Sequence, residues 1–221
     1  MAITAKDITE LRQRTQAGML DCKKALEANN GDMDKSAEWL REKGMASAAK
    51  KEGRIAAEGK VESYIHLGGK IGVLVEVNCE TDFVAKSPAF GEFVHNIALQ
   101  IAASNPLFVS EQDADPKVLE AERKVVTAQT LNEGKPAQVA EKIVEGRMKK
   151  YLQEVCLLDQ VYFRDSSKTI NEYLKETIGT IGEKMTIRRF VRYQMGEGLQ
   201  KKEENFADEI QKQIDKEKAK A

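Results

Sequence analysis

The segment IGVLVEVNCETDFVAKS (residues 71–87) carries the clearest structural signal in the sequence. Its first nine residues alternate, because every second position is apolar: Ile71, Val73, Val75, Val77 and Cys79. This alternation predicts a β-strand with one buried face, since successive side chains of a strand point to opposite sides. Whatever follows the strand is then predicted to lie at the edge of a sheet, where a rigid scaffold commonly presents binding residues.

The strand ends abruptly at Glu80, Thr81 and Asp82, and the large ring of Phe83 follows directly. Burial statistics alone favour a core position for Phe83, at the corner between the strand and the element that begins at Ser87. The alternative is an exposed ring at the end of the strand, which would form a binding surface.

Two further segments share the period of two. Val61 to Leu67 alternate before Gly68-Gly69, so residues 61–79 predict a β-hairpin with a two-residue turn. A lone hairpin is rarely stable, and MTIRRFVRY (residues 185–193) is the candidate third strand. We therefore expect an α+β fold with a small antiparallel three-stranded sheet.

Helical periodicity dominates elsewhere. A buried stripe predicts a helix that ends near residue 105, formed by Phe90, Phe93, Val94, Ile97 and Ile101. Residues 117–152 predict a helical hairpin that projects from the body, with stripes of Val118, Val125 and Val126 and of Val139, Ile143, Met148 and Tyr151. Residues 169–178 predict another helix, residues 157–163 stay unassigned, and a last amphipathic helix begins near Glu203.

Residues 1–44 predict a miniature three-helix bundle whose third helix ends at Gly44. Residues 45–60 are rich in Ala, Lys and Gly, which favours a solvated, partly helical tether. The alternative function of this stretch is a basic contact with RNA through Lys50, Lys51 and Arg54. The predicted divisions are a helical domain 1–50, a linker 51–60, an α+β core 61–200 and a C-terminal helix and tail 201–221.

Composition excludes several classes of function. The net charge is −1, so no global charge favours nucleic acid or a membrane surface. Runs of apolar residues are too short for a membrane span, and the first residues contain no apolar signal core. The odd set Cys22, Cys79 and Cys156 is typical of core thiols in a reducing compartment. We expect a cytoplasmic protein, with an organelle as the alternative.

No enzyme signature is present. Neither GxxxxGK[ST] nor GxGxxG occurs, and the two histidines are not at metal-ligand spacing. A nucleophile site of Cys79 with His95 and Asp82 can be drawn, but Cys79 continues the inward register of its strand. We therefore expect a binding protein with no catalytic residues, no metal and no cofactor.

Four segments in order resemble the elongation factor Ts family, the nucleotide exchange factors of the translational GTPase elongation factor Tu. They are LRQRTQAGMLDCKKAL (11–26), EVNCETDFVAK (76–86), GKPAQVAEKIVEGRMKKYLQEVCLLDQ (134–160) and RFVRYQMGEGL (189–199). The resemblance covers nearly the whole chain. It implies a ubiquitin-associated-like bundle at the N-terminus, for which ubiquitin binding is the competing function.

The resemblance also implies the site. Thr81, Asp82, Phe83 and Val84 match the family's TDFV run, which enters the GTPase near its nucleotide and helps displace Mg²⁺. The matching N-terminal segment implies a second partner contact, through Arg12, Thr15, Gly18, Met19, Asp21, Cys22, Lys23 and Lys24. The implied partner is elongation factor Tu, GDP-bound and nucleotide-free, without direct binding of nucleotide, nucleic acid or membrane.

Two features depart from the family pattern. Gln16 stands where the family usually has Gly before Ala-Gly-Met, which affects the turn between the first two helices. Longer members also carry the hairpin-and-helix unit twice, whereas this chain has one Gly-containing hairpin. We expect a homodimer to supply the second copy, with the alternative that one unit suffices.

Overall fold

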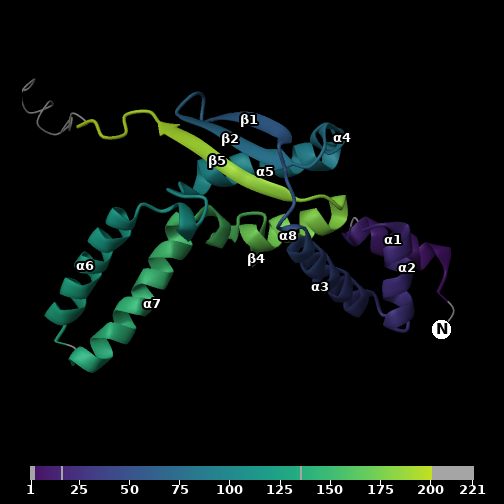
Figure 1. The fold of residues 1–221 in the computed structure, drawn as a ribbon, viewed down its shortest axis with the longest axis horizontal. Helices are drawn as coiled ribbons and strands as arrows, with labels where there is room; N and C mark the ends of the chain where they lie inside the picture. The colour runs from purple at the N-terminus through teal and green to yellow at the C-terminus, as the bar shows by residue number, and fades with distance from the viewer. Residues whose placement is uncertain (1–2, 16, 135, 201–221) are drawn as a thin grey trace, which may run out of the picture.

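The computed structural model describes residues 3–15, 17–134 and 136–200. Within these ranges the fold is α+β, as predicted, and the helical hairpin and the N-terminal helices both extend below a small sheet in the view of Figure 1. The predicted C-terminal helix from Glu203 lies outside the described residues. None of the helices in the described ranges is both long and apolar enough to span a membrane.

A three-stranded antiparallel sheet organises the fold. It consists of β1 (Glu58–His66), β2 (Ile71–Cys79) and β5 (Met185–Gln194) in the order β1-β2-β5, so the third strand is confirmed. The predicted two-residue turn is wrong, because His66 pairs with Ile71 and residues 67–70 all lie in the turn. Leu67, Gly68 and Gly69 have φ values of 50°, 63° and 96° there. Three consecutive left-handed residues form a longer loop than the Gly-Gly pair suggested.

The core lies against one face of this sheet. The alternating residues of β2 from Val73 to Cys79 are buried, as predicted, and they pack against α5 (Pro88–Ser104). Ser87 caps α5 through the N–H of Phe90, and Pro88 occupies the first turn, where its missing N–H costs nothing. The predicted stripe of α5 is confirmed as buried. The helix α8 (Ile170–Ile181) adds Ile170, Leu174 and Ile178 to the same core.

The N-terminal module is a three-helix bundle of α1 (Ala5–Thr15), α2 (Met19–Ala28) and α3 (Met33–Lys51). Its small core contains Leu11, Cys22, Ala25 and Leu26. The predicted end of the third helix at Gly44 is wrong, because α3 continues to Lys51. Residues 45–51 are therefore helical, and Ala48 joins the main core.

Gly44 has a packing role instead of a terminating one. It lies where α3 crosses α8, opposite Gly179. A Cβ built on Gly179 would lie 2.6 Å from the Cα of Gly44, closer than real Cβ atoms approach. The two backbones therefore touch directly, and this contact fixes the module against the core.

The helical hairpin is confirmed and projects from the body, attached at its base (Figure 1). It consists of α6 (Pro116–Asn132) and α7 (Ala137–Val155), which bury Val126, Val144 and Met148 between them. Three of the seven residues in the predicted stripes face outward, because Val118, Val125 and Val139 are exposed. Two packed helices bury only one narrow seam, so the apolar pattern predicted more buried residues than the hairpin has.

The remaining elements connect the hairpin to the core. They are the 3-10 turns Glu111–Asp113 and Leu157–Asp159, β3 (Val161–Tyr162) and β4 (Asp165–Thr169). The four-residue helix α4 (Asp82–Ala85) lies elsewhere, between β2 and α5. Residues 157–163, which the sequence left unassigned, thus contain a 3-10 turn and a short strand. Gln100 and Gln160 hydrogen-bond to each other there (3.2 Å) inside the protein.

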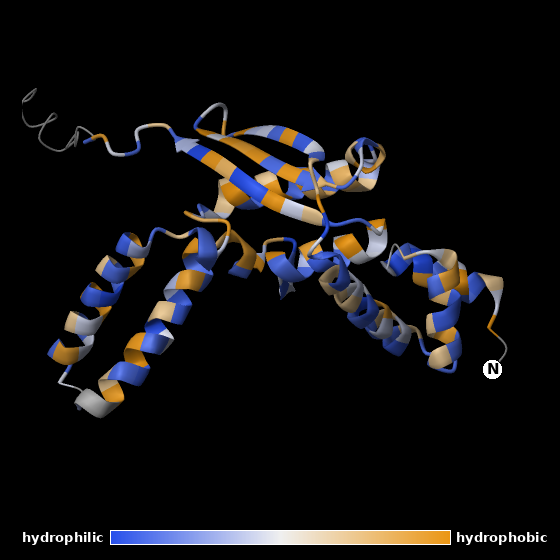
Figure 2. Ribbon diagram, viewed as in Figure 1, coloured by the Kyte–Doolittle hydropathy of each residue, from blue (hydrophilic) through white to orange (hydrophobic). Residues whose placement is uncertain are grey.

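The outer face of the sheet is apolar and uncovered within the described chain. Apolar residues alternate along β2 and β5 (Figure 2), and the outward set comprises Val61, Ile65, Leu74, Val191 and Tyr193. Glu76 stands on the same face and pairs with Arg188 (2.7 Å) and Arg189 (2.6 Å). These two guanidinium groups lower the pKa of Glu76 to about 2.

Candidate protein-interaction site

The TDFV residues lie at the end of the central strand. β2 ends at Cys79, and after Glu80 and Thr81 the chain forms α4, which stands at one end of the sheet (Figure 1). Thr81 is the N-cap of α4, and its hydroxyl accepts the N–H of Val84 at 3.4 Å. A buried strand thus ends in a short, exposed helix that we call the tip, residues 81–85.

Phe83 is 83% exposed and dominates the surface of the tip. The expectation from burial statistics is therefore wrong, and the ring is free to contact another molecule. The general rule fails here because α4 has four residues, and the side that packs on the core is occupied by Val84 and Ala85. An exposed aromatic ring on a rigid element is a typical binding anchor.

The other tip residues hold the ring in place or flank it. Val84 is half-buried against the main core. Asp82 is exposed and pairs with Lys86 at 2.8 Å, and this hydrogen bond lowers the pKa of the Asp82 carboxyl. Thr81 donates its N–H and its hydroxyl to the carboxylate of Glu183, at 3.0 and 2.7 Å. Glu183 was not predicted, since nothing in the local sequence connects it to the tip.

The second predicted set lies around the start of α2. Gly18 is its N-cap, and Met19 is exposed. Leu20, which the sequence reasoning missed, is 73% exposed beside it. Its signal was present, since Leu20 falls off the buried stripe that Cys22 and Leu26 define. Met19 and Leu20 form an apolar patch on the module.

The polar members of this set differ in their surroundings. Arg12, Lys23 and Lys24 are exposed. Asp21 is half-buried and pairs with Lys43 at 2.6 Å, and Thr15 is half-buried, donating its hydroxyl to the Leu11 carbonyl at 2.8 Å.

Cys22 differs from the others because its side chain is fully buried. Its Sγ lies 3.9 Å from the Thr15 hydroxyl and 3.7 Å from the Ala17 carbonyl. Cys22 therefore belongs to the core of the module and cannot reach a partner directly.

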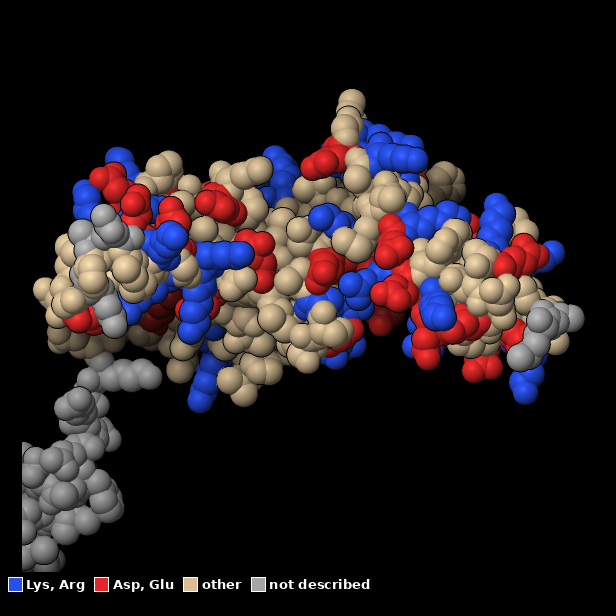
Figure 3. All heavy atoms as spheres, turned by 90° about the horizontal axis from the view of Figure 1, so that it is seen from below, with Lys and Arg blue, Asp and Glu red and all other residues tan. Residues whose placement is uncertain are grey.

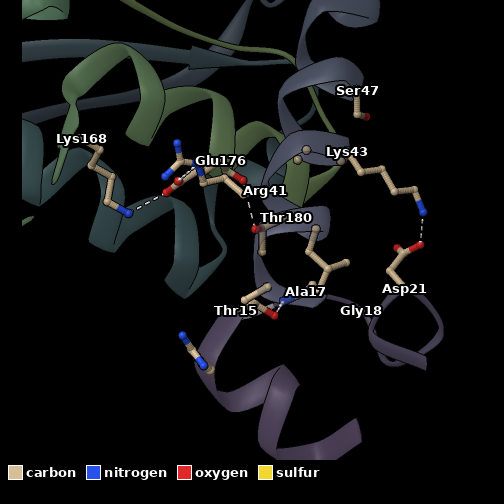
Figure 4. A pocket seen from close by; sticks show the side chains of 16 residues that line it. Thr15, Ala17, Gly18, Asp21, Arg41, Lys43, Ser47, Lys168, Glu176 and Thr180 are labelled. Atoms are coloured by element: carbon tan, nitrogen blue, oxygen red, sulfur yellow. Dashed lines mark hydrogen bonds and ion pairs between the residues drawn. The ribbon is translucent and has the colours of Figure 1, made fainter. Parts of the chain in front are cut away.

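A cleft of about 580 Å³ lies between the module and α8, beside the contact of Gly44 with Gly179 (Figure 4). Thr15, Gly18 and Asp21 line it on the module side, and Glu176 and Thr180 line it on the core side. Glu176 accepts from Lys168 at 2.7 Å and lies 3.9 Å from Arg41. Arg41 belongs to α3, so its ion pair with Glu176 crosses the cleft and adds to the glycine contact between the module and the core, whereas Lys168 holds Glu176 from the core side.

The two groups considered for nucleophilic chemistry are engaged elsewhere. Cys79 is fully buried and its Sγ donates to the carbonyl oxygen of Thr81 at 3.2 Å. Burial raises the pKa of this thiol, so it stays protonated at neutral pH. His95 lies 3.4 Å from Glu62. Cys79 is a core thiol, as predicted, and its hydrogen bond to Thr81 connects the core to the first residue of the tip.

Metal-ligating side chains do not gather in the described ranges: no group of three or more His, Cys, Asp or Glu residues there could hold an ion. The chemistry that these surfaces offer is that of an exposed ring on a short helix and of a separate apolar patch on the module, which is the chemistry of protein recognition.

The chain matches known proteins over almost its whole length. The sequence model described as elongation factor TS matches residues 5–197. The elongation factor Ts of Alkaliphilus oremlandii is 57% identical over 214 residues, which cover 97% of this chain and 99% of that protein. The elongation factor Ts of Carboxydothermus hydrogenoformans is 58% identical over 208 residues, covering 94% of this chain and 96% of that protein. On the strength of these matches and of the sheet, tip and module described above, the chain belongs to the elongation factor Ts family.

Proposed function

We propose that this protein is a cytoplasmic guanine-nucleotide exchange factor of translation elongation. It binds elongation factor Tu in its GDP-bound and nucleotide-free forms, displaces Mg²⁺ and promotes release of GDP, so that GTP can bind. The observation that carries the proposal is the exposed ring of Phe83, presented on a tip that is anchored at the end of a buried strand.

The proposed mechanism requires no catalytic group. Mg²⁺ needs near-ideal octahedral geometry and bridges protein, water and phosphate in GTPases. A ring inserted between two helices of the GTPase would move the ligands by about 1 Å, enough to spoil that geometry. Burying an exposed phenylalanine contributes about 1.5–3 kcal/mol, which can drive such a displacement.

Linkage makes the effect reversible. A factor that weakens nucleotide binding is itself bound less tightly when nucleotide returns, by the same factor. Exchange therefore accelerates because the tip binds the open conformation of the GTPase better than the closed one. Nucleotide-free elongation factor Tu is accordingly the tightest-binding form.

The module provides the proposed second contact. Met19 and Leu20 offer an apolar patch, and Arg12, Lys23 and Lys24 are exposed around it. Apolar anchors with a polar rim are the usual composition of a transient interface. In this proposal Thr15, Gly18, Asp21 and Cys22 maintain the structure of the module. They contribute little of the surface that the partner would cover.

The RNA-binding alternative loses its physical support. Lys51 is buried against the core side of α3, and Arg54 pairs with Glu80 at 3.3 Å, so Lys50, Lys51 and Arg54 do not form one free basic patch. On the face drawn in Figure 3, basic and acidic side chains are interspersed. Phosphate backbones bind best where cations gather without counter-charges.

The function is tested by mixing the full chain with elongation factor Tu loaded with fluorescent GDP and following release after addition of excess unlabelled GDP. We expect release to accelerate with increasing protein until it saturates. Release that is unchanged at micromolar protein would overturn the proposal. Added Mg²⁺ should oppose the acceleration, because it competes with the displacement step.

We further propose a homodimer, with the outer sheet face as its interface. The argument is the apolar strip of Leu74, Val191 and Tyr193 with its neighbours on β1, which another copy of the same strip would cover. A dimer would also supply a second copy of the hairpin-and-helix unit, which the family resemblance implies is doubled in longer members.

Leu74→Glu is expected to convert the dimer to a monomer. The side chain is half exposed on the central strand, so the fold tolerates the change, whereas two carboxylates in an apolar interface do not. Light scattering after gel filtration measures the mass. Leu131→Glu, a matched change on the far hairpin, should leave the mass unchanged. A wild-type protein that already has the mass of one chain would contradict the dimer.

A further inference from the structure

The turn between α8 and β5 meets the base of the tip. α8 ends at Ile181, its C-cap Gly182 has a left-handed φ of 88°, and the two following residues are Glu183 and Lys184. The Glu183 carboxylate accepts both the N–H and the hydroxyl of Thr81, at 3.0 and 2.7 Å. Two hydrogen bonds from one residue to one carboxylate fix both distance and orientation.

The contact is reciprocal. The carboxylate of Glu80 accepts the backbone N–H of Lys184 at 2.6 Å, and this hydrogen bond is the main cause of the lowered pKa of Glu80. The Nζ of Lys184 donates to the carbonyl oxygens of Glu52 and Arg54, at 2.6 and 2.8 Å. The turn therefore binds two other segments of the chain: residues 80 and 81 at the base of the tip, and residues 52–54 directly after α3.

Every polar atom of Thr81 has a partner as a result. Its N–H and hydroxyl donate to Glu183, and the hydroxyl oxygen accepts from Val84. Its carbonyl oxygen accepts from the N–H of Ala85 at 3.2 Å and from the Sγ of Cys79 at 3.2 Å. Because the hydroxyl donates to Glu183, its oxygen is turned toward the first turn of α4, where it acts as the cap.

A four-residue helix has little stability of its own, since nucleation of a helical turn is unfavourable. The position of α4 is therefore set by its cap and by the half-buried side of Val84. Phe83 itself makes few contacts with the rest of the chain, so its direction depends on the backbone of the tip. Without the cap, the ring would no longer have one fixed orientation.

We propose that Glu183 is a positioning residue, which holds Thr81 so that the tip presents the ring of Phe83 in one fixed direction. The inference rests on the proposed exchange function. Glu183 acts through Thr81 and the tip and does not itself contact the partner.

The test is a double-mutant cycle with Glu183→Ala and Phe83→Ala, read by release of fluorescent GDP from elongation factor Tu. Glu183→Ala should lower the saturating release rate by roughly 10-fold, because a misplacement of about 1 Å at an acting group can cost up to about 100-fold and the ring keeps part of its contact. The half-saturating concentration should stay within about 2-fold, since the other contacts remain. In the Phe83→Ala background, Glu183→Ala should change the rate by less than about 2-fold, because both act through the same ring.

Glu172 offers a matched control. It accepts the N–H and the hydroxyl of Thr169 at 2.8 and 3.3 Å, the same pair of bonds, at the start of α8. Glu172→Ala should leave the saturating rate unchanged. Hydrogen exchange of the Val84 amide gives a second reading that needs no partner: Glu183→Ala should speed it, and Glu172→Ala should not. Glu183→Gln keeps the size and one acceptor, and should give intermediate values if Glu183→Ala does not fold.

The outcomes separate the two proposals. If Phe83→Ala loses the acceleration and folded Glu183→Ala or Glu183→Gln keeps it, the positioning role is overturned and the exchange function stands. Additive effects in the cycle would also overturn it, since Glu183 would then act elsewhere. If wild-type protein does not accelerate release, the exchange function fails, and an unchanged Val84 exchange rate in the Glu183 variants would overturn the positioning role as well.

Discussion

Phe83→Ala is expected to lower the maximal acceleration of GDP release by roughly 10–100-fold while leaving the fold intact. The ring is 83% exposed, so its removal costs the folded chain little, within about 0.5 kcal/mol for a typical surface change. The ring would be buried only in the complex, so the alanine variant would lose about 1.5–3 kcal/mol of the free energy that burial of the ring contributes there. Each 1.4 kcal/mol corresponds to about 10-fold in a rate or an equilibrium constant. Stopped-flow release of fluorescent GDP and thermal unfolding measure the two quantities.

Phe163 provides a control for losing an aromatic ring. It is also exposed, lies outside the tip and the module, and contacts Tyr162 with ring centroids 5.4 Å apart. Phe163→Ala should leave the release rate within about 2-fold of wild type. A Phe83→Ala variant as fast as wild type would show that the ring does not act on the partner.

Gly179→Ala is expected to have the largest effect on stability. Alanine in the interior of a helix normally stabilises by about 1 kcal/mol over glycine. Here the new Cβ would lie 2.6 Å from the Cα of Gly44, and backbone atoms cannot move aside independently. Overpacking of this kind costs about 1–3 kcal/mol and would push α3 away from α8. Urea unfolding gives the free energy, and limited proteolysis between residues 52 and 57 reports release of the module.

Gly44→Ala is the matched control at the same crossing. A Cβ on Gly44 would lie 3.7 Å from the Cα of Gly179, which is ordinary contact. This variant should be neutral or more stable by up to about 1 kcal/mol, from helix propensity. Equal stabilisation by both alanines would contradict the close approach of the two helices.

Much of the fold was accessible from the periodicity of single segments. The alternation from Ile71 to Cys79 predicted the central strand and its buried face, and the stripe from Phe90 to Ile101 predicted the helix that covers it. These signals are strong because one element buries one continuous face. The hairpin at residues 117–152 was also predicted, although Val118 and Val139 proved to be exposed.

Two of the errors have different physical causes, a contact between distant segments and an unusual local backbone conformation. Gly44 looked like a helix terminator because its partner, Gly179, is invisible in the local sequence. The turn after His66 was longer than its glycine pair indicated, because Leu67 also adopts a left-handed conformation. Local propensity describes neither kind of constraint.

The site was predicted only in part. Periodicity located Phe83 at the end of a strand, and only the family resemblance indicated that it faces a partner. Glu183 could not be found from the sequence, since it lies 102 residues from Thr81. Its bonds exist because the turn after α8 and the end of β2 meet at one end of the sheet.

The unbroken α3 has a consequence for avidity. A helix of 19 residues is a stiff rod of about 28 Å. It packs against α8, and Lys184 hydrogen-bonds to the residues directly after its C-terminal end. In the proposed complex with elongation factor Tu, the module and the tip are thus two binding surfaces on one rigid frame. In that proposed complex, binding of either surface would place the other at a high effective concentration near its target, without the entropy that a flexible linker would lose. The same stiffness restricts the protein to partners whose two receiving surfaces have the matching separation.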